Sequence, residues 1–587
     1  MPRELEIAMI GIGVAVSLIL LIGIVRTLIR RYRRKRLPGS VLLELNLSDA
    51  LPEIADERIQ TMVFGKQKST VLDVVSGLRR AALNPRVKGL WLRIGTPSLG
   101  MARLQEVRDA ISLFREAGKP TIAFAETFGE GRGGNGAYYL ATACDEIYIQ
   151  PSGDVELTGL VAEAPFVKKA LEKLGVKPRL ENRSEYKNAI NMFTETGYND
   201  PHREATERYL HSLQEQIAHG ILASRTIDPA ALEAYMNDGV YDGAEALRLG
   251  LVDDLLYFDE VEKRLKEKFG AKTRRLSLTG FMARLRVRDK KPKTVALIYG
   301  VGNVMRGPSR SGGLMRSQTM GSDTVTHAFR KAIADKKVKA ILFRVDSRGG
   351  SYVASDTIWR AVREAREKNK PVVATMGDIA GSGGYFVAMG ADKVVAHPGT
   401  LTGSIGVITG KFVTRELWNR LGVDWDDVRT HENAALFSMQ QDFTETQWAQ
   451  LQATLDRIYE AFKQRVAESR GLEPAQVEEV ARGRVWSGTD AMKAGLVDRL
   501  GGYQVAFDEL RELLGVSSTT PLRLKRFPAR KSLWSRLKGR DASDEPRPLA
   551  PEAAALLGPI GELGEQLGLS APSGVLTVPD PPMPPVL

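Results

Sequence analysis

The sequence predicts an α/β protein made of two related domains in tandem, preceded by a transmembrane helix near the N-terminus. The chain has 587 residues, which is too long for one hydrophobic core. β-rich apolar runs alternate with helical patterns such as TVTHAFRKAIADKK (324–337), and this alternation favours βα units and a parallel sheet. The same order of segments occurs twice, which indicates a duplicated domain.

Four pairs of segments carry the repeat, and the third pair aligns without a gap. They are SVLLELNLS (40–48) with TVALIYGVG (294–302), VKGLWLRIGTPS (87–98) with VKAILFRVDSRG (338–349), GNGAYYLATACDEIYIQP (134–151) with GSGGYFVAMGADKVVAHP (381–398), and GVYDGAEALRLGLVDDL (239–255) with RVWSGTDAMKAGLVDRL (484–500). We therefore expect an N-terminal domain at 40–270 and a C-terminal domain at 294–515, joined by a basic linker at 271–293.

The two ends of the chain differ from this body. After a short leader (1–6), residues 7–25 (IAMIGIGVAVSLILLIGIV) are nineteen residues without a charge, enough to span a bilayer. The basic segment 26–39 follows, whereas a cleaved signal peptide carries its basic residues before the apolar core, so we expect a retained anchor. The tail 516–587 is basic and then Pro-rich, a composition that favours disorder.

The net charge of +12 is concentrated in two short runs. Residues 26–36 carry seven Lys and Arg, residues 523–540 carry eight, and neither run contains an acid. The body of the protein is therefore close to neutral, and we expect no nucleic-acid partner. The first run lies against the predicted anchor, where anionic lipid headgroups would hold it at the surface of the bilayer.

Cysteine and histidine usage argues against two further kinds of site. Cys144 is the single cysteine, so the chain has no intramolecular disulfide and no Cys-rich metal site. The six histidines include no HExxH pair, which argues against a zinc hydrolase. We expect neither a metal ion nor a cofactor.

The stretch from Asp378 to Val407 contains the first candidate for chemistry. Ser382 has Gly381 before it and Gly383 and Gly384 after it, and an apolar run follows. A serine at a sharp bend between a strand and a helix is how a nucleophile is exposed in many hydrolases. A glycine-rich turn with an incidental serine is the simpler interpretation of these residues alone.

The two copies of the repeat differ in a complementary way. Ser382 falls opposite Asn135, and Lys187 falls opposite Asn433. The separations agree, with 52 residues between Asn135 and Lys187 and 51 between Ser382 and Asn433. One copy has kept a lysine and the other a serine, as expected if a duplicated serine–lysine pair were divided between the two halves.

These motifs resemble those of the signal peptide peptidase A (protease IV) family in its long, two-repeat form. The resemblance covers about residues 40–515 and rests on MGDIAGSGGYF (376–386), LTGSIGV (401–407), DSRGGS (346–351) and EYKNA (185–189). It implies a Clp/crotonase-like fold, a β-β-α spiral, in both domains, and the activity of a serine peptidase.

The resemblance also implies a role for each candidate site residue. Ser382 would be the nucleophile and Lys187 the general base, with Ser404 hydrogen-bonded to the lysine amine. The main-chain N–H groups of Gly350 and Gly383 would hold the oxyanion. One residue departs from the family pattern: Arg348 stands where a proline is usual, which could loosen the oxyanion loop.

The chemistry of a serine–lysine pair fits these residues on its own terms. A serine hydroxyl is a weak nucleophile until a base takes its proton. A lysine can act as that base only as the neutral amine, which requires a pKa lowered from about 10.4 to near 7–8. Burial in an apolar setting can supply that change, and apolar residues from Ala189 to Phe193 follow Lys187. His397 and His431 flank the site in sequence and leave a serine–histidine arrangement as an alternative.

We therefore expect a membrane-anchored serine endopeptidase that degrades cleaved signal peptides and other short apolar peptides. The resemblance implies a ring of several copies, a tetramer. A crotonase-like protein that binds acyl-CoA would use the same oxyanion loops, but a divided serine–lysine pair has no purpose there. An inactive membrane scaffold is the third reading, although it would not need the complete GSGG and LTGSIG motifs.

The sequence gives two answers about the side of the membrane. By resemblance, the protein is a single-pass protein of the bacterial inner membrane with its catalytic body in the periplasm. The positive-inside rule, applied to residues 26–36, places the body in the cytoplasm instead.

Overall fold

The chain folds into two compact units that interleave along the sequence. The computed structural model describes residues 22–23, 37–48, 50–55, 68–95, 99–131, 133–285, 291–310 and 318–529. Of the described residues, unit 1 holds those within Met1–Leu99, Val107–Thr158 and Gly220–Asp289, and unit 2 holds those within Gly100–Glu106, Gly159–His219 and Lys290–Leu587. Two segments of the first half of the sequence, 100–106 and 159–219, therefore fold as part of unit 2.

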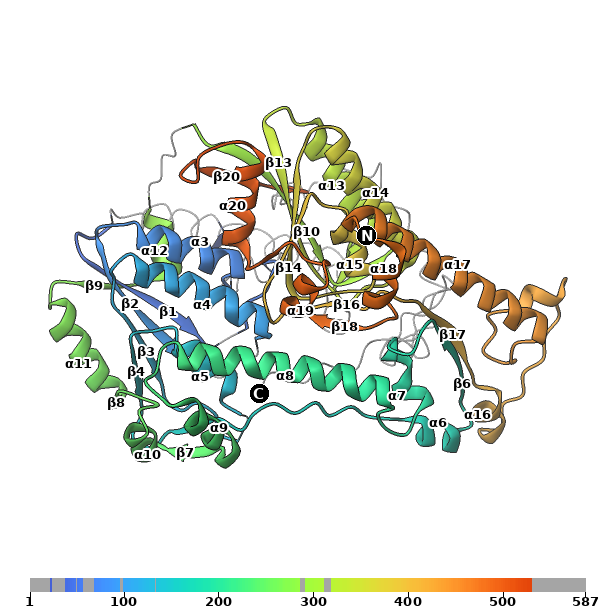
Figure 1. The fold of residues 1–587 in the computed structure, drawn as a ribbon, viewed down its shortest axis with the longest axis horizontal. Coiled ribbons are helices and arrows are strands. Elements are labelled where there is room, and N and C mark those ends of the chain that lie inside the picture. The colour runs from blue at the N-terminus through green and yellow to red at the C-terminus, as the bar shows by residue number, and fades with distance from the viewer. Residues whose placement is uncertain are drawn as a thin grey trace, which may run out of the picture. The chain divides into compact units, whose positions relative to one another are not determined.

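Unit 1 is built on a parallel sheet of six strands (Figure 1). In sheet order they are β8 (Asp254–Leu255), β4 (Glu146–Ile149), β3 (Thr121–Ala125), β2 (Val87–Ile94), β1 (Val41–Leu47) and β9 (Arg274–Ser277). The central strands are apolar on both faces, as parallel strands covered by helices on each side must be. A separate antiparallel pair joins β5 (Asp154–Glu156) to β7 (Val240–Asp242).

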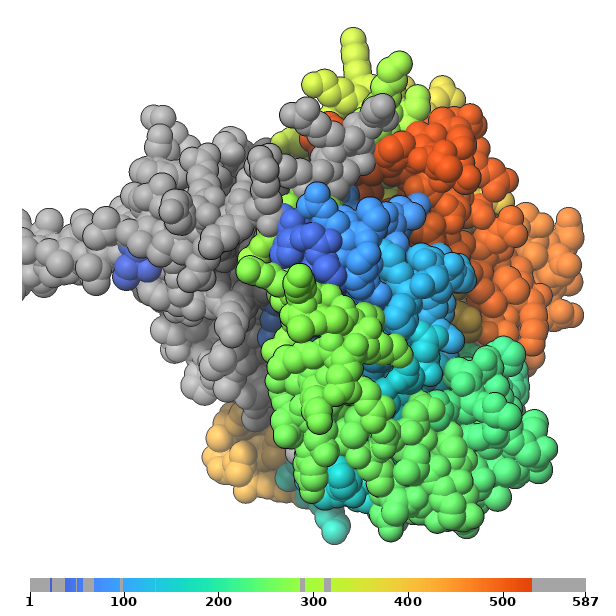
Figure 2. All heavy atoms as spheres, turned by 90° about the vertical axis from the view of Figure 1, so that its left-hand side faces the viewer, coloured from blue at the N-terminus to red at the C-terminus, as the bar shows by residue number. Residues whose placement is uncertain are grey.

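The helices of unit 1 cover this sheet. They are α3 (Val71–Ala82), most of α4 (Met101–Glu116), α5 (Asn135–Ala141), α9 (Pro229–Asp238), α10 (Gly243–Arg248), α11 (Phe258–Phe269) and α12 (Leu278–Arg284). Helix α3 begins where the Thr70 hydroxyl and the Asp73 carboxylate cap each other's backbone N–H. Helix α11 buries Val261 and Leu265 against the sheet, and its exposed side faces the viewer in Figure 2, in bright green.

Unit 2 is built on the larger sheet. Its main path runs β18 (Val485–Ser487), β16 (Leu401–Gly403), β14 (Val372–Gly381), β13 (Val338–Ser347), β10 (Lys293–Val301) and β20 (Leu522–Phe527). Off this path, β15 (Lys393–Ala396) pairs with β14, and β19 (Arg499–Leu500) pairs with β15. All pairs are parallel except β16 with β18. Two small sheets complete the unit: β11 (Asn303–Met305) with β12 (Thr319–Gly321), and β6 (Lys177–Asn182) with β17 (Ile408–Val413).

Helices pack on the large sheet of unit 2 and on its small sheets. They are α6 (Lys168–Leu174), α7 (Asn191–Thr194), most of α8 (Asp200–Leu222), α13 (Ser322–Ala334), α14 (Tyr352–Glu367), α15 (Gly383–Met389), α16 (Arg415–Arg420), α17 (Glu445–Arg470), α18 (Pro474–Val480), α19 (Gly488–Lys493) and α20 (Tyr503–Leu513), with short 3₁₀ turns η1 (Asn188–Ile190) and η2 (Glu432–Ala435). Successive residues of β13 show the two faces: the Phe343 ring meets Phe329 of α13 at 5.2 Å, and Arg344 lies 4.5 Å from the Tyr503 ring of α20.

The two large sheets share one strand order, which confirms the predicted duplication of an α/β plan. The order β9, β1, β2, β3, β4, β8 of unit 1 has its counterpart in β20, β10, β13, β14, β15, β19 of unit 2. The match includes the edge strands β9 and β20, which lie outside the four pairs of repeated segments.

Two stretches outside the predicted domains form strands and helices. Strand β9 and helix α12 lie inside the predicted linker 271–293, and β20 lies beyond residue 515, where the tail was predicted to begin. Those predictions are wrong for these stretches. Both are edge strands with exposed basic residues: β20 exposes Arg523 and Lys525 alternately, and β9 exposes Arg274 and Arg275, so neither shows an apolar pattern in the sequence.

The predicted anchor at 7–25 lies outside the described residues except for 22–23, and so does the basic run 26–36. Within the described part of the chain, no helix combines the length and apolar character needed to cross a membrane.

Candidate active site

Ser382 lies at a strained turn between strand β14 and helix α15. Its φ and ψ are 52° and −119°, a region that residues with a side chain rarely adopt. The Ser382 N–H donates to the Gly403 carbonyl at 2.8 Å, and the Ser382 carbonyl accepts from the Phe386 N–H at 2.9 Å. A Cβ at Gly384 would come within 2.3 Å of the Ser347 carbonyl oxygen, so this turn requires glycine there. The backbone is therefore fixed on both sides of the serine, as in a nucleophile elbow.

The predicted oxyanion donors lie next to each other. Gly349 and Gly350 have φ of 109° and 146°, which only glycine adopts easily. A Cβ at Gly383 would lie 3.1 Å from the Gly350 nitrogen, so the two backbones are in close contact. Among the described residues, neither the Gly350 N–H nor the Gly383 N–H donates to a protein acceptor. Both donors are thus available to an oxygen of a substrate.

The oxyanion loop is held by hydrogen bonds although it has Arg348 in place of a proline. The Gly349 N–H donates to the Ser347 hydroxyl oxygen at 3.2 Å. The Val304 N–H of β11 donates to the Gly349 carbonyl at 2.8 Å, and the Val304 carbonyl accepts from the Ser351 N–H at 2.9 Å. These hydrogen bonds hold the loop on both sides of Gly349 and Gly350, and they act against the loosening expected from Arg348.

Lys187 is buried, with 5% of its surface exposed, and its amine is bonded to Ser404. Nζ donates to the Ser404 Oγ at 2.7 Å and to the Ser404 carbonyl oxygen at 2.9 Å. The contact with Ser404 is the one expected from the resemblance. Residues 482–483 close over the lysine: the Arg482 carbonyl accepts from the Tyr186 N–H, and a Cβ at Gly483 would lie 2.5 Å from the Lys187 Cβ.

The structure brings Lys187 and the backbone N–H of Ser382 to two adjacent residues, Ser404 and Gly403. Lys187 binds Ser404, and Ser382 binds the carbonyl of the preceding residue, Gly403. Ser404 has a φ of 50°, and a Cβ at Gly381 would lie 3.7 Å from its Cβ. Every residue of this arrangement belongs to unit 2 of one chain.

The two histidines considered as alternative bases are engaged elsewhere. The Nε2 of His397 lies 3.1 Å from the Oε2 of Glu106, and both side chains are buried. His431 is exposed, with its Nδ1 at 3.0 Å from the hydroxyl of the neighbouring Thr430. This geometry favours the lysine over either histidine.

The matching turn of unit 1 is filled by the protein itself. The Glu156 carboxylate accepts from the Gly131 N–H at 2.6 Å and from the Gly133 N–H at 2.9 Å. Glu156 pairs with Val240 of β7 as Gly403 pairs with Val485 of β18, so the strand ladders make Glu156 the counterpart of Gly403. Asn135 stands in place of the serine. The Glu156 carboxylate thus occupies two N–H groups of the loop before Asn135. The sequence comparison did not single out Glu156.

The model of peptidase family S49 matches the chain twice, at residues 113–272 and 364–517. Protease 4 of Salmonella typhi is 32% identical over 459 residues, which cover 76% of this chain and 72% of that protein. Protease 4 of Haemophilus influenzae is 30% identical over 501 residues, covering 81% and 77%. The chloroplastic serine protease SPPA of Arabidopsis thaliana is 31% identical over 441 residues, covering 73% of this chain and 63% of that protein.

A mutant of ClpP1 from Listeria monocytogenes is a similar solved structure, at 14% identity and a TM-score of 0.23, covering 36% of this chain and 94% of that one. Because that TM-score is low, the Clp/crotonase-like spiral stays a prediction. The two family matches fall in the two halves of the repeat, and two relatives align over most of their length. The chain therefore belongs to peptidase family S49, as a serine peptidase of the signal peptide peptidase A (protease IV) type.

Proposed function

We propose that the chain is a membrane-anchored endopeptidase in which Ser382 is the nucleophile and Lys187 the general base. The observation that carries the proposal is a pair of contacts with adjacent residues: the Lys187 amine donates to Ser404, and the backbone N–H of Ser382 donates to the Gly403 carbonyl. The burial of Lys187 supports it further, because burial disfavours the ammonium form of a lysine.

The proposed reaction follows from these positions. The neutral Lys187 amine takes the Ser382 proton as Oγ attacks the carbonyl carbon of the peptide bond. The N–H groups of Gly350 and Gly383 stabilise the oxyanion, a contribution of about 3–4 kcal/mol per donor. The protonated lysine then gives its proton to the leaving amine, and water hydrolyses the acyl-enzyme with Lys187 again as the base. Ser404 holds the amine in place through both steps.

The proposed substrates are cleaved signal peptides and other short apolar peptides at the membrane. The predicted anchor at 7–25 supports this class, because it would keep the catalytic body beside the bilayer. We place the body in the periplasm of a bacterium by resemblance, and propose a homo-oligomer, a tetramer in the family. Protection of the body from added protease in sealed inner-membrane vesicles of known orientation tests the side of the membrane.

Labelling with a serine-directed fluorophosphonate tests the dyad. The wild type is expected to be acylated at Ser382, and Ser382→Ala is expected to lose the label. Lys187→Ala is expected to slow acylation by about 10²- to 10⁴-fold, the range of general-base catalysis. Lys411→Met is the matched control, because Lys411 is a second buried lysine of unit 2, bonded to the Leu436 carbonyl.

Unchanged labelling of Lys187→Ala would remove the lysine as base. Turnover of an acyl-CoA thioester without cleavage of peptides would favour the crotonase-like alternative instead.

A further inference from the structure

Strand β14 carries a bulge just before the turn of Ser382. In the ladder with β13, Val345 pairs with Met376 and Ser347 pairs with Ala380, so two steps along β13 face four steps along β14. Asp346 lies opposite the extra residues. Bulges bend a strand and redirect the residues that follow it, and here the following turn presents the proposed nucleophile.

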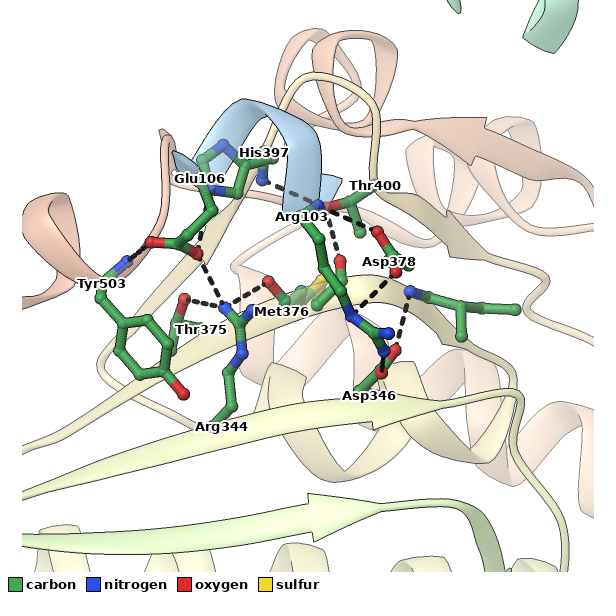
Figure 3. A network of polar contacts seen from close by, with 12 residues as sticks. Arg103, Glu106, Arg344, Asp346, Thr375, Met376, Asp378, His397, Thr400 and Tyr503 are labelled. Atoms are coloured by element: carbon green, nitrogen blue, oxygen red, sulfur yellow. Dashed lines mark hydrogen bonds and ion pairs between the residues drawn. The ribbon is translucent and has the colours of Figure 1, made fainter. Parts of the chain in front are cut away.

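Two carboxylates meet at this bulge, and Arg103 binds both of them (Figure 3). Its Nε lies 3.0 Å from the Oδ2 of Asp378, and its Nη2 is bonded to Asp346. The Arg103 backbone N–H donates to the other oxygen of Asp378 at 3.0 Å, and Asp346 also accepts from the Ile379 N–H. The side chains of Asp346 and Asp378 are only 8% and 14% exposed, so little solvent screens their mutual repulsion.

A second ionic contact stands one turn further along α4. The buried Glu106 accepts from the Tyr503 N–H at 2.7 Å and pairs with Arg344, which donates to the Met376 carbonyl at 2.8 Å. Burial alone would raise the pKa of the Glu106 carboxyl, but His397, Arg344 and the Tyr503 N–H together hold it below its ordinary value. Ion pairs of Arg103 and Glu106 therefore fix the first turn of α4 to β13 and to the bulge in β14.

We infer that Arg103 is a positioning residue for the peptidase reaction. By pairing with Asp346 of β13 and Asp378 of β14 it fixes the geometry of the bulge, and so keeps the Ser382 turn in its position relative to the Gly349–Gly350 loop. The inference rests on the proposed function. Asp346 stands four residues before Gly350, and Asp378 stands four residues before Ser382. One guanidinium therefore connects the segment that leads to the oxyanion loop with the segment that leads to the proposed nucleophile.

The distribution of these residues in the repeat supports the inference. Asp346 falls opposite Gly95, so the strand of unit 1 that matches β13 has no carboxylate at this position. Arg103 comes from the first half of the sequence but folds in unit 2, as Lys187 does. Asp346, Asp378 and Arg103 thus all lie in unit 2, the unit that contains Ser382.

The test compares Arg103→Met with a matched control, Arg360→Met. Arg360 forms an exposed ion pair with Glu367, and its side chain is 57% exposed. We expect Arg103→Met to lower kcat per titrated active site about 30- to 100-fold, with KM within about threefold, because small misplacements of reacting groups have effects of this size. The rate of Ser382 acylation should fall by a similar factor. Arg360→Met should leave all three quantities unchanged.

Counting active sites with the probe separates positioning from a general loss of folding. A purely structural role would lower the number of titratable sites and leave the rate per site at the wild-type value. Adding Asp346→Asn and Asp378→Asn to Arg103→Met removes the repulsion, and we expect it to restore kcat per site at least about tenfold.

Folded Arg103→Met enzyme with wild-type kcat and acylation rate would overturn the inference. If Arg103→Met does not fold, Asp378→Asn decides, because it keeps the arginine and removes one of its two ion pairs: unchanged rates in that variant overturn the inference equally. Ser382→Ala and Lys187→Ala are measured in parallel. If Ser382→Ala and Lys187→Ala are still labelled, the proposed dyad is refuted. If those two variants lose the label while Arg103→Met keeps wild-type rates, only the role of Arg103 is refuted.

Discussion

The amine of Lys187 lies 2.7 Å from the hydroxyl of Ser404, and the two residues are 217 positions apart in the sequence. The same amine reaches the Ser404 carbonyl oxygen at 2.9 Å. Two acceptors on one residue fix the direction of the lysine side chain at its tip. The neighbouring Gly403 carbonyl fixes the backbone of Ser382, so Ser404 stands at the junction of the two proposed catalytic residues.

Ser404→Ala is predicted to lower kcat about 10- to 100-fold with little change in KM, because the lysine amine would lose the hydroxyl that orients it. Steady-state kinetics on an apolar peptide measures both constants. Ser517→Ala is the control, since the exposed Ser517 hydroxyl contacts only Thr519 among the described residues. Equal kcat in Ser404→Ala and wild type would show that Ser404 does not orient the base.

Gly350→Ala is predicted to abolish acylation of Ser382, with a loss of at least about 100-fold, the effect of losing one oxyanion donor. The new Cβ would lie 2.2 Å from the Val304 carbonyl oxygen, and the φ of 146° is strained for alanine. Both effects displace the Gly350 N–H.

Gly515→Ala is the control for backbone strain alone. Gly515 also has a positive φ, of 61°, but no atom lies within 4 Å of the added Cβ. This variant should lose about 1 kcal/mol of stability and keep its acylation rate. A normal acylation rate in Gly350→Ala would contradict the assignment of the oxyanion donors.

Tyr459→Phe is predicted to lower kcat about 3- to 10-fold through the loop of Lys187. The Tyr459 hydroxyl accepts from the Arg482 N–H at 3.0 Å and lies 3.4 Å from the Ser184 Oγ, and both partners have positive φ. Loss of the hydroxyl frees two strained residues that flank the lysine. Active-site titration followed by steady-state kinetics gives the rate per site.

Tyr241→Phe provides the matched comparison for Tyr459. Tyr241 is also buried, and its hydroxyl donates to the Tyr235 carbonyl at 3.1 Å in unit 1. Both variants should lose about 1 kcal/mol of stability, but only Tyr459→Phe should lose activity. An equal kcat in the two variants would remove Tyr459 from the site.

The sequence allowed the duplicated α/β plan to be predicted, because the repeat preserves long apolar strands and one gap-free segment. The EYKNA and LTGSIGV motifs led us to expect a hydrogen bond between the Lys187 amine and Ser404, and the structure contains it. Short motifs with fixed backbone requirements, such as GSGG and LTGSIG, carry this kind of information well.

The contribution of Arg103 and Glu106 could not be predicted. MARLQE at 101–106 is an ordinary start of an amphipathic helix, and the contacts of Arg103 with Asp346 and Asp378 join residues 243 and 275 positions apart. Ion pairs over such separations leave no local pattern. The edge strand β20 was missed for a different reason, since its alternation is carried by basic residues that resemble a linker.

The segment that carries Lys187 should lose stability as the pH falls from about 6.5 to about 4, because of His202. Burial lowers the pKa of His202 from 6.5 to about 4, and its ring packs on Tyr198 at 4.6 Å and on Phe166 at 6.2 Å. Between these two values the unfolded chain binds a proton that the folded chain does not, so unfolding is favoured as the pH drops and the effect levels off below about 4. Since the imidazole is partly exposed, we expect the free energy of unfolding to fall by about 1–2 kcal/mol, less than the full shift in pKa would give.

His202→Phe keeps the aromatic packing and should flatten the dependence of the free energy of unfolding on pH across this window, measured by urea denaturation at pH 7, 6 and 5. An identical slope in His202→Phe and wild type would show that His202 is not the titrating group.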